Sequence, residues 1–433
     1  MTVTETGTVT EAVTEATAVR VTDEELVARY GSPLYVYDLD RVIAARDDLR
    51  DALPEPFTLF YSLKANPHPG LVRALGEGDR PCRAEVCSTG ELASALEAGH
   101  SADRILYSGP GKTAEEISAA LTAGVRTFSV ESLGDLRRLG VRAVLHGTTA
   151  DALIRVNSAA AAATTSIRMT GTPSQFGFDA EGLSELLPEI RAVEGIRVAG
   201  AHFFPLSNSK DEASLIAEFQ ETIRGAARLE AELGTPLRLL DIGGGFAAPY
   251  SVPGERPVYG ELRAELERTL DEHFPRWRQG VPEIACESGR YLVGDSGRLL
   301  TTVTNVKQSR GRTFAVLDAG INTLGGMAGL GRLLPLSVEP KAGSGDGAAE
   351  EIVVTLAGPL CTPGDLLSRS ARMPLPHPGD VIAVPNVGAY GPTASLLLFL
   401  GRPAPAEILL RAGEVTSASR LISSRAEIDT GVQ

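Results

Sequence analysis

Between about residues 55 and 285, short β-forming runs alternate with helical stretches, and this alternation limits the folds open to the chain. The helical stretches, such as ELASALEAG and EFQETIRGAARLEAELG, repeat apolar residues every three or four positions. The strand-like runs are FTLFYSL, CRAEVC, RILYSG, TFSV, ALIRVN, RVAGAHFF, LRLLDIG and EIACES. Eight strands alternating with helices predict an α/β fold with a (β/α)8 TIM-like barrel. A doubly wound open sheet shows the same alternation, so periodicity alone leaves both architectures open.

The chain changes character after residue 290, where β-rich segments separated by Gly and Pro turns replace the alternation. This pattern of β-rich segments and turns predicts a C-terminal all-β domain. We expect the barrel to span residues 40–285 and the β-rich domain to combine residues 21–39 with residues 286–425. Residues 1–20, rich in Thr, Val and Glu, predict a disordered tail.

The composition of the chain disfavours certain classes of binding partner. A formal net charge of −14 argues against nucleic acid and anionic membranes, and the chain has no apolar run long enough to cross a bilayer. The N-terminus lacks the basic and apolar segments of a secretory signal. The four cysteines form no CxxC pair, which predicts a reduced, cytoplasmic enzyme without a metal site.

Lys64 stands where the apolar strand FTLFYSL ends, before the segment ANPHPG. A lysine at the end of a barrel strand points into the mouth where barrel active sites assemble. There, desolvation is expected to lower the pKa of the amine, and a neutral amine reacts with an aldehyde to give a Schiff base. Taken alone, Lys64 is better explained as a lysine that reaches from a strand end to solvent.

Two further strand ends carry groups suited to an anionic ligand. In DIGGGF, three successive glycines allow backbone N–H groups to approach an anion such as phosphate. In CESGRYLV, Glu287 could pair with a pyridinium nitrogen and Arg290 could grip a phosphate. A tight βα turn and a structural Glu–Arg pair are the alternatives for these two motifs.

Two loops in the C-terminal half add reactive side chains. Cys361 lies in the loop GPLCTPGD beside Asp365, where an exposed thiol could serve as an acid or a nucleophile. It could equally be a half-buried small apolar residue. Tyr390 lies between glycines in NVGAYGPTAS, and its hydroxyl could reach a ligand.

Together and in this order, YSLKAN, SQFGF, GAH, LDIGGGF, ESGRY, CTPGD and GAYG resemble the alanine-racemase-fold decarboxylases that use pyridoxal phosphate. That family includes the diaminopimelate, ornithine and arginine decarboxylases, and the resemblance covers residues 25 to 420. It implies that Lys64 binds pyridoxal 5'-phosphate covalently, that Glu287 pairs with the ring nitrogen, and that Phe204 stacks on the ring.

The resemblance also implies a phosphate site and a shared active site. The implied phosphate contacts are Gly243, Gly244, Gly245, Ser207, Arg290 and Tyr390. The cysteine loop of this family comes from the other subunit of a homodimer, so Cys361 and Asp365 are expected to complete the partner's site. Cys361 is then expected to return a proton to the substrate, which Asp365 and Tyr390 would contact.

Departures from the family concern the substrate. Phe204 replaces a histidine that stacks on the cofactor, whereas His202 matches the family's other histidine in a supporting role. In diaminopimelate decarboxylases the distal end of the substrate is read by an arginine, a tyrosine and a glutamate, and here Gly326, Leu330 and Thr362 stand at those positions. Free diaminopimelate is therefore a poor candidate, because the polar contacts that would recognise it are missing.

The variants SGPGKT, SQFGFD, LCTPGD and VPNVGAYGPTAS are similar to a secondary-metabolism subgroup. Its members decarboxylate carrier-protein-bound aminoacyl groups or derivatised amino acids such as citryl-diaminopropionate. This resemblance predicts an α-decarboxylase whose substrate carries a derivatised distal end. A decarboxylase of free amino acids, an amino-acid racemase and a non-catalytic homologue remain the alternatives.

Overall fold

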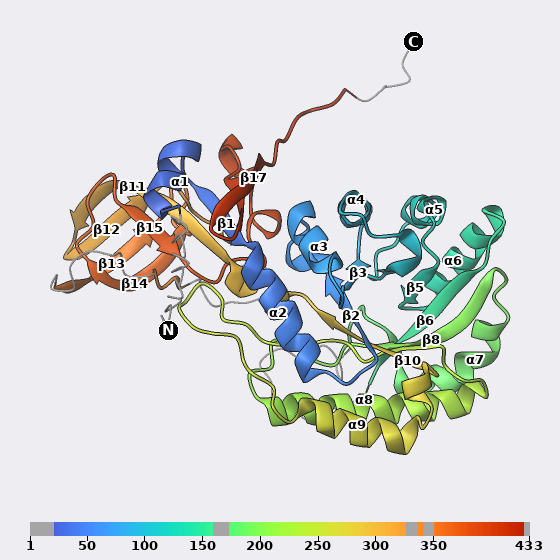
Figure 1. The fold of residues 1–433 in the computed structure, drawn as a ribbon. Coiled ribbons are helices and arrows are strands. Elements are labelled where there is room, and N and C mark those ends of the chain that lie inside the picture. The colour runs from blue at the N-terminus through green and yellow to red at the C-terminus, as the bar shows by residue number, and fades with distance from the viewer. Residues whose placement is uncertain (1–20, 159–172, 326–336, 341–349, 428–433) are drawn as a thin grey trace, which may run out of the picture.

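The computed structural model describes residues 21–158, 173–325, 337–340 and 350–427. Figure 1 shows two parts, a strand barrel surrounded by helices and a β-rich part beside it. The predicted tail, residues 1–20, lies outside the described residues. Among the helices that the structure describes, none has the length and apolar character needed to cross a membrane.

Eight parallel strands form the barrel. In chain order they are β2 (Phe57–Ser62), β3 (Arg83–Val86), β4 (Ile105–Tyr107), β5 (Thr127–Val130), β6 (Ala150–Asn157), β8 (Ile196–Phe203), β9 (Leu239–Asp241) and β10 (Glu283–Ser288). The sheet order is β5-β4-β3-β2-β10-β9-β8-β6, and β5 also pairs with β6. That pairing closes the sheet, so the predicted barrel is confirmed and the open sheet is excluded. A short strand, β7 (Phe178–Asp179), pairs with β6.

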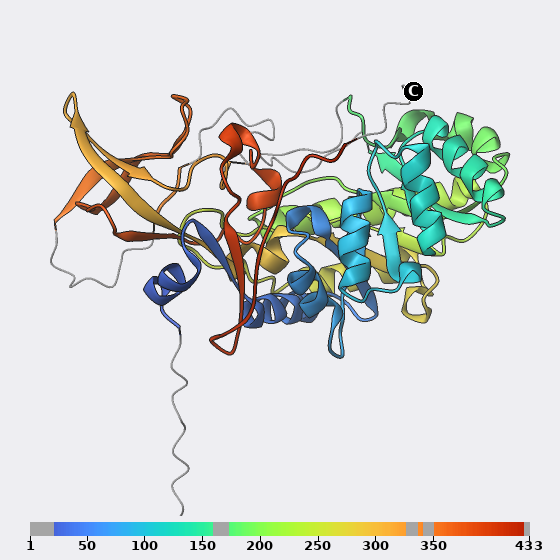
Figure 2. The same ribbon diagram turned by 90° about the horizontal axis from the view of Figure 1, so that it is seen from above.

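Helices cover the outside of the barrel (Figure 2). They are α2 (Leu39–Ala52), α3 (Pro69–Gly76), α4 (Thr89–Glu97), α5 (Ala114–Ala123), α6 (Leu133–Leu145), α7 (Leu183–Arg191), α8 (Glu212–Leu233) and α9 (Leu262–His273). Local chemistry fixes several of their ends. Thr113 and Ser132 cap the N-termini of α5 and α6, and Gly124 and Gly234 end α5 and α8 in the left-handed conformation.

The barrel interior is layered, with polar residues above apolar ones. The apolar cluster comprises Phe60, Leu106, Leu153, Ala199, Leu239 and Ala285. Two positions after five of these residues come Ser62, Ser108, Arg155, Asp241 and Glu287. Because residues two apart in a strand point to the same face, these polar groups also point into the barrel, nearer the carboxyl ends of the strands.

The β-rich part is a mixed sheet. Its order is β14 (Leu366–Pro374), β13 (Glu351–Ala357), β12 (Arg312–Leu317), β11 (Gly297–Ser309), β1 (Leu34–Asp38), β16 (Ala406–Arg411) and β17 (Glu414–Arg420), and β15 (Val381–Val384) pairs with β11. The predicted β-rich second part is thus confirmed. Helix α1 (Asp23–Tyr30) and strand β1 bring N-terminal residues to this sheet, where β1 lies between β11 and β16.

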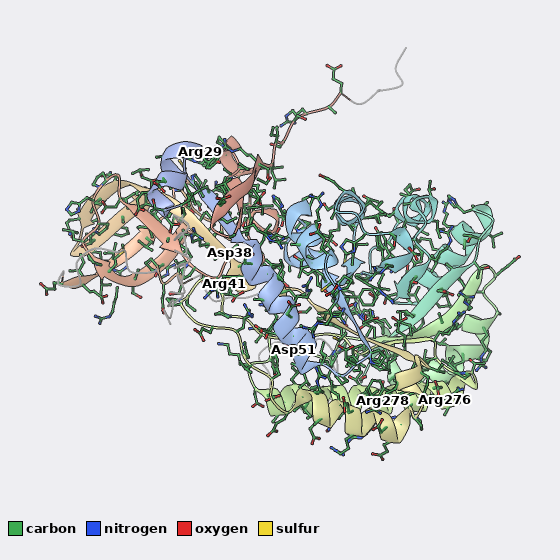
Figure 3. All side chains as sticks on the ribbon, in the orientation of Figure 1. Arg29, Asp38, Arg41, Asp51, Arg276 and Arg278 are labelled. Atoms are coloured by element: carbon green, nitrogen blue, oxygen red, sulfur yellow. The ribbon has the colours of Figure 1, made fainter. Side chains whose placement is uncertain are left out.

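Helix α2 runs between the two parts, with Arg41 near its start and Asp51 near its end (Figure 3). The Arg41 guanidinium lies 2.8 Å from a carboxylate oxygen of Asp295, which Arg256 also contacts. Asp295 is nearly fully buried and lies two residues before the start of β11. The two arginines therefore compensate a buried charge at the place where the barrel meets the β-rich sheet.

A buried ion pair in the motif SGPGKT gives a test of stability. Lys112 Nζ lies 2.8 Å from Asp135 Oδ2, and both side chains are at most 4% exposed. We expect Lys112→Met to lower the free energy of unfolding by about 3 kcal/mol or more, because Asp135 would keep a buried charge without its ammonium partner. Urea unfolding followed by circular dichroism measures the change.

The matched control is Arg137→Met, because the Arg137–Glu189 pair has a similar N–O distance of 2.7 Å but side chains that are 58% and 53% exposed. That change should cost less than about 1 kcal/mol. Equal losses for the two variants would contradict the role assigned to the buried pair.

Candidate active site

The residues after Lys64 attach the end of β2 to the β-rich part. Lys64 lies in a short helical turn, Leu63–Ala65, directly after β2. The Tyr390 N–H donates to the Ala65 carbonyl at 2.7 Å, and Asn66 Nδ2 donates to the Gly388 carbonyl at 2.9 Å. The loop that carries Tyr390 is thereby held against the strand end that carries Lys64.

A pocket beside Lys64 contains nearly all the predicted cofactor contacts. Its lining residues are Ser62, Lys64, Phe204, Ser207, Asn208, Gly244, Gly245, Phe246, Glu287, Ser288, Gly289, Arg290 and Tyr390. Gly243 precedes them in the glycine turn, with its amide donating to Asp241 Oδ1 at 2.9 Å. The structure therefore brings together side chains that lie far apart in the sequence.

The charge state of Lys64 differs from the sequence-based expectation. Its Nζ lies 3.8 Å from Glu85 Oε2, and its side chain is 43% exposed. Enclosure by protein lowers the pKa of Lys64, but the negative charges of Glu85 and Glu287 outweigh this, and the net direction is upward. The predicted lowering of this pKa was wrong, because no local pattern indicates that Glu85 lies next to the amine.

Glu85 carries the negative charge that raises the pKa of Lys64. Burial would raise the pKa of Glu85, but the Lys64 ammonium and a hydrogen bond from Ser108 lower it to about 2. The Cys87 thiol also donates to the carboxylate at 3.3 Å. In the protein without cofactor, Lys64 and Glu85 therefore form a charged pair inside the barrel mouth.

A second charged cluster surrounds Glu287. Its Oε1 lies 3.3 Å from His202 Nε2, and His202 Nδ1 is 2.7 Å from Ser129 Oγ. Burial alone lowers the pKa of His202, but Glu287 raises it, so the net direction is upward. Burial and the charge of Glu287 together raise the pKa of Asp241 to about 7. The ligand atoms of His202, Asp241 and Glu287 lie within 4.8 Å of one another, a spacing that could also hold a metal and that the sequence analysis did not anticipate.

The anion-binding side of the pocket offers amide donors and a guanidinium. Within the described residues, the Gly244 and Gly245 amides donate no hydrogen bond, and the Arg290 guanidinium has no hydrogen-bond or ion-pair partner. Arg290, the first residue of α10 (Arg290–Val293), lies 5.0 Å from the centroid of the Tyr390 ring. Tyr390 has a positive φ of 54°, and Tyr250 Oη donates to its carbonyl at 3.1 Å.

These groups fit pyridoxal phosphate, the cofactor expected from the sequence. The amides of Gly244 and Gly245, together with Arg290, can hold a phosphate. Glu287 lines the pocket, and its carboxylate could accept a hydrogen bond from a protonated ring nitrogen while its Oε1 lies 3.3 Å from His202 Nε2. Lys64 supplies the amine, with its Nζ 5.2 Å from the centroid of the Phe204 ring.

Of the predicted substrate residues, Tyr390 lines the pocket of its own chain, whereas Thr362 and Asp365 do not. Cys361 is exposed, and neither it nor Thr362 lines the pocket of its own chain. Asp365 is buried, and its carboxylate accepts the backbone N–H groups of Ile321 at 2.8 Å and Leu360 at 2.6 Å. It therefore holds two loops together within one chain, and its expected role at the partner's substrate stays a prediction. Gly326 lies outside the described residues.

Sequence analysis missed Glu85, Arg155 and Asp241 as site residues. Each is a charged residue within or at the end of an apolar barrel strand, and each is buried. That pattern is a usable signal, because a buried charge in a strand needs a partner or a ligand. It could have identified these residues in AEV, LIRVN and LLDIG, although it could not have paired them.

Gly244→Ala tests the glycine turn. A Cβ on Gly244 would lie 2.5 Å from the Glu287 carbonyl oxygen and 3.3 Å from Phe204 Cε2, so the turn must move away from the end of β10. We expect the dissociation constant for pyridoxal phosphate to rise at least about tenfold, since a shift costing about 1.4 kcal/mol suffices. Titration of the cofactor into the apoprotein, followed by visible absorbance, measures it.

Gly260→Ala is the control, because no atom lies within 4 Å of its added Cβ. A Gly244→Ala protein that binds the cofactor as tightly as this control would show that the close packing of the turn is unimportant for binding.

Comparison with known proteins agrees with this geometry. The chain is 32% identical over 399 residues to the L-glutamyl-[BtrI acyl-carrier protein] decarboxylase of Niallia circulans, covering 90% of this chain and 91% of that protein. It is 33% identical over 399 residues to the diaminopimelate decarboxylase of Methanothermobacter thermautotrophicus, covering 90% and 89%. Diaminopimelate decarboxylase from Helicobacter pylori, crystallised with L-lysine, superposes with a TM-score of 0.78 at 28% identity, covering 91% of this chain and 95% of that chain.

The family described as "Pyridoxal-dependent decarboxylase, pyridoxal binding domain" matches residues 39–294, which is more than half of the chain. This match includes the whole barrel and the pocket residues from Lys64 to Arg290. The chain therefore belongs to the pyridoxal-dependent decarboxylases and is a carboxy-lyase of the alanine-racemase fold that uses pyridoxal phosphate.

Proposed function

We propose that this enzyme removes the α-carboxylate of an amino acid whose distal end is derivatised, with an aminoacyl group carried by a carrier protein as the leading substrate. The observation that carries the proposal is the neutral, small character of the residues at the distal positions. Thr362 stands where a glutamate would read a distal amino group, and Gly325 adjoins the position of the missing arginine. The 32% identity to a decarboxylase named for a carrier-bound glutamyl group supports the same substrate class.

The pocket residues have separate roles in this reaction. Lys64 would hold the cofactor through its amine, which can react with an aldehyde. The bound cofactor supplies an electron sink for the electron pair left behind when CO₂ departs. Glu287, supported by His202 at 3.3 Å, keeps a proton on the ring nitrogen, and Arg290 holds the phosphate.

Protonation of the substrate carbon is assigned to Cys361 of a second copy of the chain. In its own chain, Cys361 is exposed and lies outside the pocket that contains Lys64. Three loops, residues 320–325, 358–365 and 396–402, are tied together in one chain, and we call them the donor loops. Gly325 N donates to Ser395 Oγ just before the third loop, and Arg402 donates to the Pro359 carbonyl. A homodimer that seats these loops over the partner's pocket would complete two shared sites.

The surface of the donor loops favours a substrate with an extended, weakly polar arm. Within residues 396–400, the side chains of Leu396, Leu398, Phe399 and Leu400 are 41–73% exposed, whereas Leu397 is partly buried. Such a cluster of exposed apolar side chains is unusual on a solvated surface and marks a place that a partner or ligand covers. The same segment supplies no acid that would attract a free distal ammonium group.

Measuring CO₂ release tests the substrate class. The purified enzyme should act on a carrier-bound or N-acylated amino acid at least about 100-fold faster, in kcat/KM, than on free diaminopimelate, lysine, ornithine or glutamate. The physical reason is that the free amino acids leave a charged distal group without a partner. Rapid turnover of free diaminopimelate would favour the alternative function, to which the 33% identical relative points.

Mixing two defective variants tests the shared site. Lys64→Ala and Cys361→Ala, each nearly inactive alone, should regain about a quarter of the wild-type rate when co-expressed, because half of the dimers are mixed and each has one intact site. Size-exclusion chromatography must show that both variants dimerise. Dimers that regain no activity would place Cys361 outside the partner's site.

A further inference from the structure

The guanidinium of Arg155 lies between two phenylalanine rings. Its Cζ is 4.8 Å from the centroid of the Phe176 ring and 5.9 Å from that of Phe204. Both distances are within the range of a cation–π interaction. Arg155 is only 8% exposed, so the interaction is largely shielded from water and therefore stronger than it would be at the surface.

The Glu131 carboxylate holds this arrangement in place. Arg155 lies two positions after Leu153 of the apolar layer, so its side chain points into the barrel. Glu131, just after β5, receives a hydrogen bond from Arg155 Nη1 at 3.1 Å on Oε1 and from the Gly177 N–H at 2.7 Å on Oε2. Glu131 therefore fixes both the guanidinium and the turn that carries Phe176.

The turn itself leaves little room for adjustment. Gly177 has a positive φ of 75°, and a Cβ there would lie 3.0 Å from the Arg155 carbonyl oxygen and the Asn157 nitrogen. The following residue, Phe178, is buried and pairs with Val156 in β6. The two residues that follow Phe176 thus hold it over the guanidinium.

Phe204 needs such support. A phenyl ring has no polar edge that a hydrogen bond could orient, so only contacts with its faces and edges fix its angle. The ring centroid is 5.2 Å from Lys64 Nζ, the atom to which the cofactor attaches, and Phe204 lines the same pocket. Any rotation of this ring therefore changes the surface that the cofactor meets.

We propose that Arg155 and Phe176 are positioning residues that hold the Phe204 ring in the orientation required by the cofactor, with Glu131 as their anchor. The contact of Arg155 with the Phe204 ring orients that ring, as a hydrogen bond could orient a polar ring at position 204. The proposal concerns cofactor binding and does not depend on which substrate the enzyme decarboxylates.

Phe176→Leu is the direct test, because leucine keeps apolar volume but has no π face. The dissociation constant of pyridoxal phosphate from the full-length protein should rise about fivefold, as expected for the loss of about 1 kcal/mol of cation–π interaction. The visible circular dichroism of the bound cofactor, which reports its orientation, should weaken. The thermal midpoint of the apoprotein should change little, because Phe176 is only partly buried.

Phe178→Leu is the matched control, because Phe178 is buried two residues away and makes no ring contact with Arg155 within the described structure, and its backbone pairing with Val156 does not need the phenyl ring. It should lower the thermal midpoint without changing cofactor affinity or circular dichroism. If both variants weaken cofactor binding equally, or if Phe176→Leu binds like the wild type, the proposal is overturned.

A double-mutant cycle separates positioning from general packing. In a Phe204→His background, the ring gains nitrogen atoms that hydrogen bonds can orient, so Phe176→Leu should have a smaller effect on the dissociation constant. Arg155→Lys, which keeps the charge beside Glu131 but loses the planar guanidinium, should resemble Phe176→Leu in the original background. An effect of Phe176→Leu that is equal in both backgrounds would contradict the proposal.

Discussion

The active site depends on pairs of polar and charged side chains in the barrel mouth that compensate one another. Lys64 and Glu85 form one pair, and Glu287 and His202 form another, with N–O distances of 3.8 and 3.3 Å. Glu85 and Glu287 are buried, and an unpaired charge at their depth would cost several kcal/mol, so both are tolerable only because their partners are present. The same pairs set the protonation states of the site, keeping Lys64 charged until the cofactor binds and Glu85 ionised at all ordinary pH values.

The layer beneath these charges explains why they can be held in place. An apolar cluster that includes Phe60, Leu153 and Ala285 fills the barrel, and the polar groups follow two residues later on the same strands. The strand backbone therefore fixes where each charge lies, and close packing below prevents the charged layer from collapsing inward. Loops need only add the groups that contact the ligand from above, such as Arg290 and Tyr390.

The β-rich part contributes to the site through hydrogen bonds as well as through loops. Asn66 and Ala65, directly after Lys64, bond to the backbone of Gly388 and Tyr390. Asp365 similarly joins the cysteine loop to the loop at Ile321. The sheet thus holds Tyr390 over the chain's own pocket and carries an exposed cysteine loop outward, an arrangement suited to sharing sites between two copies.

The sequence by itself determined the eight strands, the β-rich second part and most of the pocket residues, because strand periodicity and motif order are local properties that the chain displays directly. Closure of the barrel became visible only through the β5–β6 pairing, since no residue pattern distinguishes an open sheet from a closed one. Tertiary structure alone decided the charge of Lys64, the internal role of Asp365 and the stacking of Arg155 on Phe204. These properties depend on contacts between side chains that are far apart in the sequence, and the order of residues does not give the distances between them.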